Sequence, residues 1–202
     1  MRIHCIIHAS FEQPSYFKEW ALAKGFQFRH TLIAKGEPLP SLSDFDVLLI
    51  MGGTQSPLLQ NKFPYLKDEI AFIKEAAHHD KRIIGVCLGA QLISESFGAV
   101  TEQSPNKEIG FFPLFLTEKG REDPIFKDFP PEFLSGHWHN DMPGIPAGAK
   151  VLAESRGCPR QIIRYSSKIY GFQCHLEFDK PGVARLIRKC SSELTVDTYV
   201  QS

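Results

Sequence analysis

Hydrophobic positions in the first half of the chain follow two different periods. Continuous apolar or β-branched runs predict four strands, at residues 2–8, 26–33, 46–51 and 81–84. Apolar residues at helical spacing predict three helices, at residues 14–25, 64–79 and 90–97. Because strands and helices alternate, we expect an α/β fold with a mostly parallel, flavodoxin-like central sheet and helices on both faces.

The pattern changes after Gly98. Short β-like pieces separated by Pro and Gly turns follow, at residues 111–116, 133–137, 150–153, 161–165 and 169–174. A last amphipathic helix is predicted at residues 181–194. We expect the short pieces to extend the sheet with a smaller antiparallel part. Since no repeat, linker or low-complexity segment interrupts the chain, we expect a single domain over residues 1–202.

Composition narrows the class of protein. The 202 residues are 43% hydrophobic and 23% charged, with 23 basic and 23 acidic side chains in balance. These values exclude disordered and fibrous classes. No block of like charge indicates a nucleic-acid or anionic membrane partner, and no apolar stretch approaches the roughly 20 residues of a transmembrane helix. The oligomeric state stays open.

Five unpaired cysteines favour a reducing compartment. None of them forms a CxxC motif, which argues against a disulfide framework and against a structural zinc site; they are Cys5, Cys87, Cys158, Cys174 and Cys190. The N-terminal residues already enter the first predicted strand, which argues against a signal peptide. We therefore expect a cytoplasmic protein.

The sequence Gly85-Val-Cys87-Leu-Gly89 is the strongest chemical signal. It joins a predicted strand to a predicted helix, so Cys87 lies where the backbone turns sharply between two glycines. That arrangement is typical of a nucleophile elbow, with Cys in place of Ser. A helix that begins just after the cysteine favours its thiolate. The alternative is a structural Cys buried at the end of a strand.

Two further stretches could serve such a nucleophile. The run Gly171–Glu177 ends with His175 and Glu177, which would share a side of an extended strand, so the carboxylate could orient the imidazole that acts on the thiolate. The alternative is that His175 and Glu177 are a surface pair without a catalytic role.

The sequence Met51-Gly52-Gly53 ends another strand, where the Gly53 N–H could stabilise an oxyanion together with the Leu88 N–H. The alternative there is a simple tight turn.

Taken in order, these motifs resemble the class I glutamine amidotransferases of the Cys-His-Glu type. The resemblance rests on GVCLGAQ, on MGG upstream and on FQCHLEF downstream. Residues 107–110, residues 134–141 and Pro146 are similar to the subgroup that includes the glutaminase domain of GMP synthase. The match spans nearly the whole chain.

The resemblance implies a role for each matching residue. Cys87 would be the nucleophile, His175 the acid and base, and Glu177 its orienting partner. Backbone N–H groups of Gly53 and Leu88 would form the oxyanion hole. The substrate would be bound by Gly52, Gln91, His139, Asn140 and Asp141, the last three through their backbone. We expect the outer wall of the pocket to come from residues 54–63 and 104–111.

Two features bear on these expectations. The family usually has the sequence His-Pro-Glu, whereas Leu176 stands here in place of the proline. We expect this difference to cause a geometric adjustment without loss of activity.

His137 and His139, followed by Asp141, resemble a metal-binding triplet, but no further ligand completes it in the sequence. We therefore expect no metal and no cofactor.

The implied reaction is hydrolysis of the side-chain amide of glutamine, or of a γ-glutamyl compound, through a γ-glutamyl thioester. In one hypothesis the ammonia passes to a separate partner synthase. In a second, the chain is a stand-alone γ-glutamyl hydrolase or peptidase that acts on a small metabolite. In a third, it is a catalytically silent binding module on the same fold.

Overall fold

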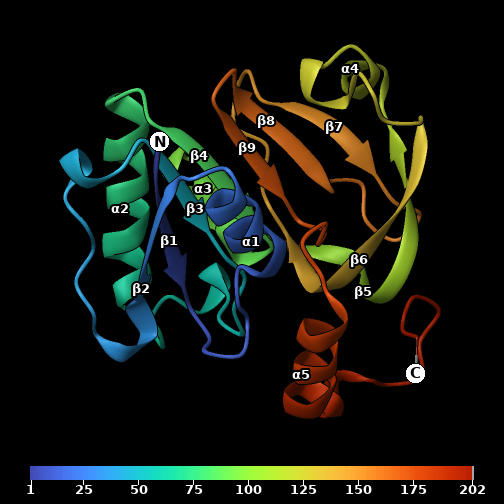
Figure 1. Ribbon diagram of the computed structural model, residues 1–202. Coiled ribbons are helices and arrows are strands. Elements are labelled where there is room, and N and C mark those ends of the chain that lie inside the picture. Colours follow the sequence, from blue (N-terminus) through green and yellow to red (C-terminus); the bar gives the residue numbers. More distant parts are fainter. Residues whose placement is uncertain (202) are drawn as a thin grey trace.

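The computed structural model describes residues 1–201, and the strands in this range form one sheet of nine (Figure 1). Their order across the sheet is β2-β1-β3-β4-β9-β8-β7-β5-β6. The strands are β1 (Arg2–Ile7), β2 (Gln27–Leu32), β3 (Val47–Ile50), β4 (Arg82–Val86), β5 (Glu102–Leu116), β6 (Glu132–Met142), β7 (Lys150–Glu154), β8 (Ile162–Ser166) and β9 (Ile169–Phe172). The helices are α1 (Ser15–Ala23), α2 (Tyr65–His78), α3 (Leu88–Ser96), α4 (Glu118–Arg121) and α5 (Lys180–Cys190).

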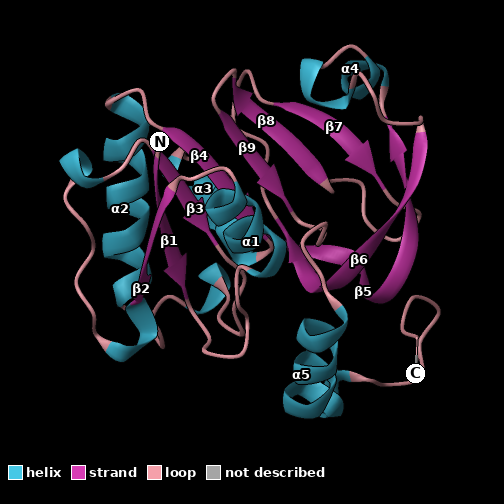
Figure 2. Ribbon diagram, viewed as in Figure 1, coloured by secondary structure: helices cyan, strands magenta, loops and turns pink. Residues whose placement is uncertain are grey.

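The sheet has a parallel half and an antiparallel half. β2, β1, β3, β4 and β9 run parallel, whereas the pairs β9–β8, β8–β7, β7–β5 and β5–β6 are antiparallel. Figure 2 shows α1, α2 and α3 beside the parallel half, while the antiparallel half is mostly strand. The expected fold class, a mostly parallel sheet flanked by helices with an antiparallel extension, is confirmed.

Alternating side chains in the central strands divide the core into two layers. Leu48 and Ile50 of β3 pack in one buried cluster with residues of α2 and α3, such as Ile73 and Leu92. Residues one position away on the same strand pack on the other face with α1. This period of two explains why β3 is apolar at every position, since both faces of a parallel sheet are covered.

The antiparallel half differs in detail from the sequence prediction. The pieces expected at 111–116 and 133–137 belong to two long strands, β5 and β6, which pair over most of their length. The first part of β5 is polar, and its register shifts between Gln103 and Glu108, so hydrophobic periodicity gave no signal there. The short helix α4 was also missed. α5 ends at Cys190, and a 3₁₀ turn over Ser191–Glu193 completes the segment expected to be helical.

The carboxyl ends of β1, β3, β4 and β9 lie at the same edge of the parallel half, because these neighbouring strands run in the same direction. Side chains that follow these ends are brought together, as is usual in open α/β sheets. Within the described residues, no helix is both long and apolar enough to cross a membrane.

Candidate active site

Cys87 occupies a strained turn between β4 and α3. Its backbone has φ 52° and ψ −109°, a conformation that non-glycine residues rarely adopt. The two flanking glycines permit close packing at this point. A side chain at Gly85 would collide with the backbone of Gly89, and one at Gly89 would collide with the backbone of Ile50. The first turn of α3 therefore packs directly on the sheet, and the strained residue is the cysteine.

Two groups contact the Cys87 sulfur. The Gln173 side-chain amide Nε2 donates to Sγ at 3.5 Å, and Sγ lies 3.7 Å from the backbone oxygen of Trp138. The cysteine is 8% exposed and lines a pocket of about 150 Å³ together with His175. The sulfur is therefore held in a fixed position and open on the side of the pocket.

His175 and Glu177 form a buried pair in the segment after β9. The His175 Nδ1 and the Glu177 Oε1 are 2.7 Å apart, and their side chains are 4% and 5% exposed. The backbone of His175 is bound to Gly136 of β6 by hydrogen bonds of 2.8 and 3.1 Å, and its ring stacks on Phe178 with centroids 4.1 Å apart. The contacts with β6, a strand of the antiparallel half, therefore position this imidazole beside the carboxyl ends of the parallel strands.

The electrostatic environment of His175 favours the imidazolium. Burial alone would lower the pKa of this histidine, but the charge of Glu177, the nearby Cys87 thiol and the hydrogen bond to Glu177 raise the pKa well above its ordinary value. Among the described residues, the second ring nitrogen, Nε2, has no hydrogen-bond partner. A proton held at Nε2 would face the pocket.

The two residues expected in the oxyanion hole, Gly53 and Leu88, both line the pocket beside Cys87. Gly52 does not line it. The backbone oxygen of Gly52 lies 3.2 Å from the Nδ1 of His8, and a side chain at position 52 would collide with the carboxylate of Glu12. The two glycines are thus in different settings: Gly53 lines the pocket, whereas the carbonyl of Gly52 points toward the buried His8.

The other expected binding residues lie around the pocket. Gln91 lines it, and its amide Nε2 donates to Gln173 Oε1 at 3.0 Å. His139, Asn140 and Asp141 of β6 form one wall, where the carboxylate of Asp141 accepts a hydrogen bond of 2.6 Å from a serine hydroxyl.

The outer wall differs from the sequence expectation. The first residues of the 54–63 loop line the pocket, but among the described residues none from 104–111 does. That prediction was wrong because β6, which pairs with β5 along this stretch, supplies the wall instead. The remaining side comes from the C-terminal segment, with Leu186, Cys190 and Glu193.

The sequence did not reveal Glu12 as part of this site. It lies in the loop after β1 and lines the pocket next to Cys87 and His175. Burial raises the pKa of Glu12 to about 7, even though the nearby His175 and His8 lower it. Its position at the carboxyl end of a parallel strand was the one available signal, since loops there gather at the ligand site.

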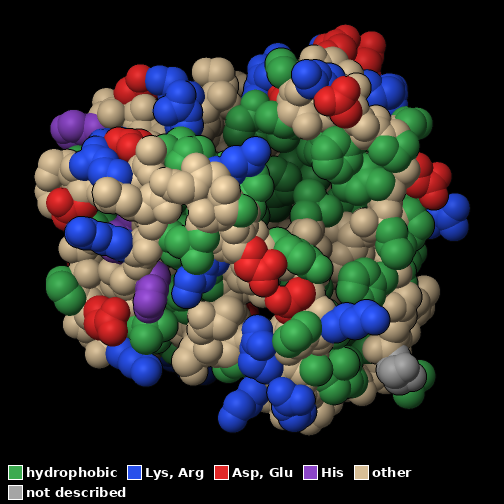
Figure 3. Space-filling model, viewed as in Figure 1, with side chains coloured by type: hydrophobic (Ala, Val, Ile, Leu, Met, Phe, Trp, Pro, Cys, Tyr) green, Lys and Arg blue, Asp and Glu red, His purple; other side chains and the backbone are tan. Residues whose placement is uncertain are grey.

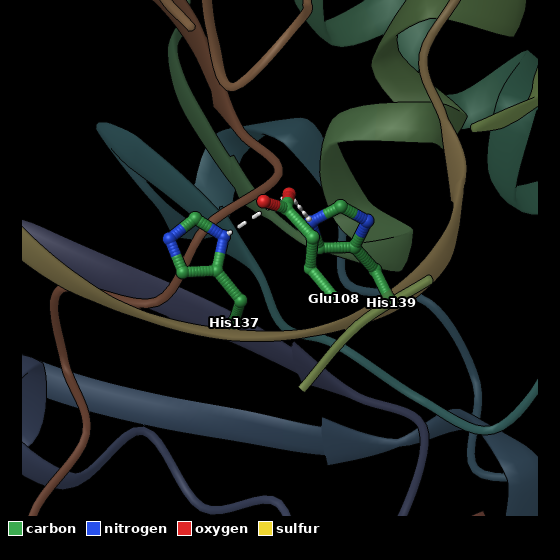
Figure 4. Close-up of side chains that lie close together, drawn as sticks. All are labelled: Glu108, His137 and His139. Atoms are coloured by element: carbon green, nitrogen blue, oxygen red, sulfur yellow. Dashed lines mark ion pairs between the residues drawn. The ribbon is translucent and has the colours of Figure 1, made fainter. Parts of the chain in front are cut away.

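A second polar cluster lies behind the pocket wall. Glu108 of β5 and the histidines His137 and His139 of β6 converge (Figure 4), with candidate ligand atoms all within 4.8 Å of one another. Glu108, not Asp141, therefore completes the triplet considered in the sequence. Ser155 and Gln161 donate hydrogen bonds to its carboxylate, so the charge is compensated by protein donors.

A larger hollow on the face of the sheet is apolar. It measures about 390 Å³ and is lined by α1, β4, β9 and the segment after β9, through residues such as Trp20, Val86, Phe172 and Leu176. Figure 3 shows hydrophobic side chains gathered in such a depression on this face of the molecule. Among the described residues that line it there is no Cys or Ser, whereas the smaller pocket is lined by Cys87.

Comparison with known proteins shows the family of the chain. Residues 24–190 match the family model described as glutamine amidotransferase class-I. The chain is 44% identical over 198 residues to the glutamine amidotransferase-like protein YfeJ of Salmonella typhimurium, and the match covers 96% of the chain and 83% of that protein. The chain therefore belongs to the class I glutamine amidotransferases.

More distant relatives and solved structures point the same way. A GMP synthase (glutamine-hydrolyzing) of Thermosipho africanus is 31% identical over 131 residues, which cover 64% of the chain but only 24% of that longer protein. The crystal structure of SMU.1228c has a TM-score of 0.95 at 46% identity, covering 100% of this chain and 89% of the other. A glutamine amidotransferase from Thermotoga maritima has a TM-score of 0.88 at 26% identity, with coverage of 96% and 84%.

Proposed function

We propose that the chain hydrolyses the side-chain amide of glutamine by nucleophilic catalysis at Cys87. The observation that carries the proposal is the juxtaposition at one pocket of a cysteine in a strained elbow and a buried histidine whose far nitrogen is bound by a carboxylate. Membership of the class I glutamine amidotransferases supports the same chemistry.

The mechanism follows from the positions of the side chains. The Cys87 thiolate attacks the carbonyl carbon of the carboxamide, and the C–N bond breaks after the His175 imidazolium gives its Nε2 proton to the leaving nitrogen. Ammonia leaves, and the acyl group remains on sulfur as a γ-glutamyl thioester. Water then gives a proton to the neutral imidazole and attacks the thioester, which releases glutamate and restores the thiolate with its imidazolium.

The oxyanion of each tetrahedral intermediate would be bound by the backbone N–H groups of Gly53 and Leu88. Both residues line the pocket on the side of the nucleophile. Donors fixed in advance stabilise a developing negative charge without reorganising, and each is worth about 10²- to 10³-fold in rate.

The pocket suits a small amino acid. Its volume of about 150 Å³ is well below that of common ligand sites, which supports a small substrate such as free glutamine. Three carboxylates line it, those of Glu12, Asp141 and Glu193, and no Lys or Arg of the described chain does. These charges favour the α-ammonium group, while backbone groups at residues 139–141 would receive the α-carboxylate.

The fate of the ammonia defines two versions of the function. In the first, a separate synthase consumes it, as the relation to GMP synthases suggests. In the second, the chain acts alone on a small γ-glutamyl compound. The third hypothesis, a silent binding module, is disfavoured by the paired His175 and Glu177 beside Cys87.

The test is to incubate the purified chain with glutamine and with γ-glutamyl amides and to measure glutamate and ammonia. Turnover of glutamine that a co-purifying protein stimulates supports the amidotransferase. Strong turnover of γ-glutamyl amides alone supports the hydrolase. Cys87→Ser is the control, because loss of a triad nucleophile costs on the order of 10⁶ in rate. If the variant keeps the activity, the assignment of Cys87 is wrong.

A further inference from the structure

A buried charged pair lies directly behind the turn that carries Gly53. His8 follows β1, Glu69 belongs to α2, and both side chains are fully buried, with 0% exposed. The Nε2 of His8 lies 2.9 and 3.1 Å from the two carboxylate oxygens of Glu69, and its Nδ1 lies 3.2 Å from the backbone oxygen of Gly52. The imidazole therefore links a helix to the candidate oxyanion turn.

The hydrogen-bond partners of His8 determine which of its ring nitrogens carry a proton. A backbone carbonyl only accepts hydrogen bonds, so Nδ1 must carry a proton and donate it to Gly52. On the other side Nε2 faces a carboxylate. Burial alone lowers the pKa of His8, but the charge of Glu69, its hydrogen bond and the charge of Glu12 outweigh burial and raise the pKa. The geometry therefore fits an imidazolium, with a donor at each end.

The Gly52 carbonyl and the Gly53 N–H belong to one planar peptide unit. A hydrogen bond that fixes the carbonyl therefore also fixes the direction of the N–H on the opposite side. The turn is packed tightly against the histidine, because a side chain at Gly53 would place its Cβ 2.6 Å from the Cβ of His8. A cation at the carbonyl also polarises the amide, which makes the N–H a stronger donor.

Stability alone does not account for such a pair. Replacing a buried ion pair by apolar side chains of similar volume is often neutral or stabilising. One core cluster between β1 and α2 is apolar and contains Ile6, Leu66 and Ile73. A charged pair in this setting, bonded to one particular peptide, indicates a positioning role.

We propose that the His8–Glu69 pair positions and polarises the Gly52–Gly53 peptide as the oxyanion-binding element of this site. Neither residue touches the substrate; both act through the Gly53 N–H. The proposal rests on the proposed function for its kinetic consequence, whereas the charge state and geometry of the pair can be tested without any substrate.

The first test is the ¹⁵N NMR spectrum of the His8 ring at pH 7, just above the ordinary histidine pKa of about 6.5. We expect both ring nitrogens to be protonated in the native chain and only one in Glu69→Gln. Neutral His8 in the native chain would overturn the proposal. This measurement needs no turnover.

The second test separates kcat from KM for glutamine. We expect Glu69→Gln to lower kcat by about 10-fold, and the double variant His8→Phe, Glu69→Leu to lower it by about 100-fold, within the range found for oxyanion donors. KM should stay within about twofold. The affinity for glutamate γ-semialdehyde, whose adduct with Cys87 carries an oxyanion, should fall by the same factors as kcat.

Two controls exclude a general loss of structure. Alkylation of Cys87 by iodoacetamide, a displacement that needs no oxyanion hole, should proceed at the native rate in every variant. Thr31→Val is the matched variant, because Thr31 is the hydrogen-bond partner, at 2.9 Å, of His4, which is a buried histidine within β1. It should leave kcat unchanged.

Native kcat and native semialdehyde affinity in the double variant would overturn the proposal. A native chain that hydrolyses no glutamine would instead overturn the proposed function alone. In that case the ring-nitrogen spectrum and the trapping of the aldehyde by Cys87 still decide the role of His8.

Discussion

The Nδ1 of His175 lies 2.7 Å from the Oε1 of Glu177, although only one residue separates them and neither belongs to a strand. β9 ends at Phe172, so the pair does not arise from strand alternation. It arises because the backbone of His175 bridges to Gly136 of β6, which holds the imidazole while the chain turns back toward it. A short-range sequence motif thus depends on a long-range contact.

This pair predicts the effect of Glu177→Gln. Without the carboxylate, the proton at Nδ1 is no longer compensated and the imidazole is less well oriented, so kcat should fall by about 10²- to 10⁴-fold. Because Glu177 raises the pKa of His175, its removal lowers that pKa and the imidazolium is lost at a lower pH. The alkaline limb of the kcat/KM profile should therefore move to lower pH. An unchanged limb would contradict the assigned role.

Glu12 predicts a pH dependence of substrate binding. Burial raises the pKa of this carboxyl to about 7, so it is neutral below that pH and anionic above it. Binding of the α-ammonium group should strengthen as the pH rises through about 7. In Glu12→Gln, KM should rise by about 10-fold, the loss expected for one charge-assisted hydrogen bond. The change of KM with pH near 7 should disappear; if it persists, another group is responsible.

We expect the site to tolerate substitution of Leu176. Its side chain is 40% exposed and faces the apolar hollow rather than the pocket. His175 is in an antiparallel bridge, an extended conformation that a following proline favours. Leu176→Pro should therefore change kcat by less than about threefold, as for most surface substitutions. A larger loss in the glutamine assay would show that the leucine adjusts the position of the catalytic pair.

The cluster behind the pocket predicts acid sensitivity. Burial lowers the pKa of His137 to about 4, and the charge of Glu108 only partly opposes this. Between pH 4 and about 6.5 the unfolded chain binds a proton that the folded chain does not, so stability falls as the pH falls. The loss amounts to about 3 kcal/mol over that range.

His137→Phe removes the titrating imidazole and keeps an aromatic ring that fits against the neighbouring Phe112. Urea unfolding from pH 4.5 to 7.5 should show a shallower decline of the free energy of unfolding than in the native chain. Equal slopes for the two proteins would place the acid sensitivity elsewhere.

The sequence predicted the parallel half of the fold well, because its strands are buried on both faces and its helices are amphipathic. It predicted the polar first part of β5 poorly, since that strand is held by backbone pairing with β6 rather than by an apolar pattern. The elbow at Cys87 was visible because two glycines and a strand-to-helix junction are local features. Glu12 and Glu69 were not, as their proximity to the site depends on tertiary contacts.

In the proposed mechanism, Cys87 carries the acyl group. The most direct measurement is mass spectrometry of the chain quenched in acid during turnover of glutamine, followed by peptide mapping. We expect one γ-glutamyl adduct, on Cys87, that is absent from Cys87→Ser. An adduct on Cys5, Cys158, Cys174 or Cys190, or turnover without any adduct after rapid quenching, would contradict it.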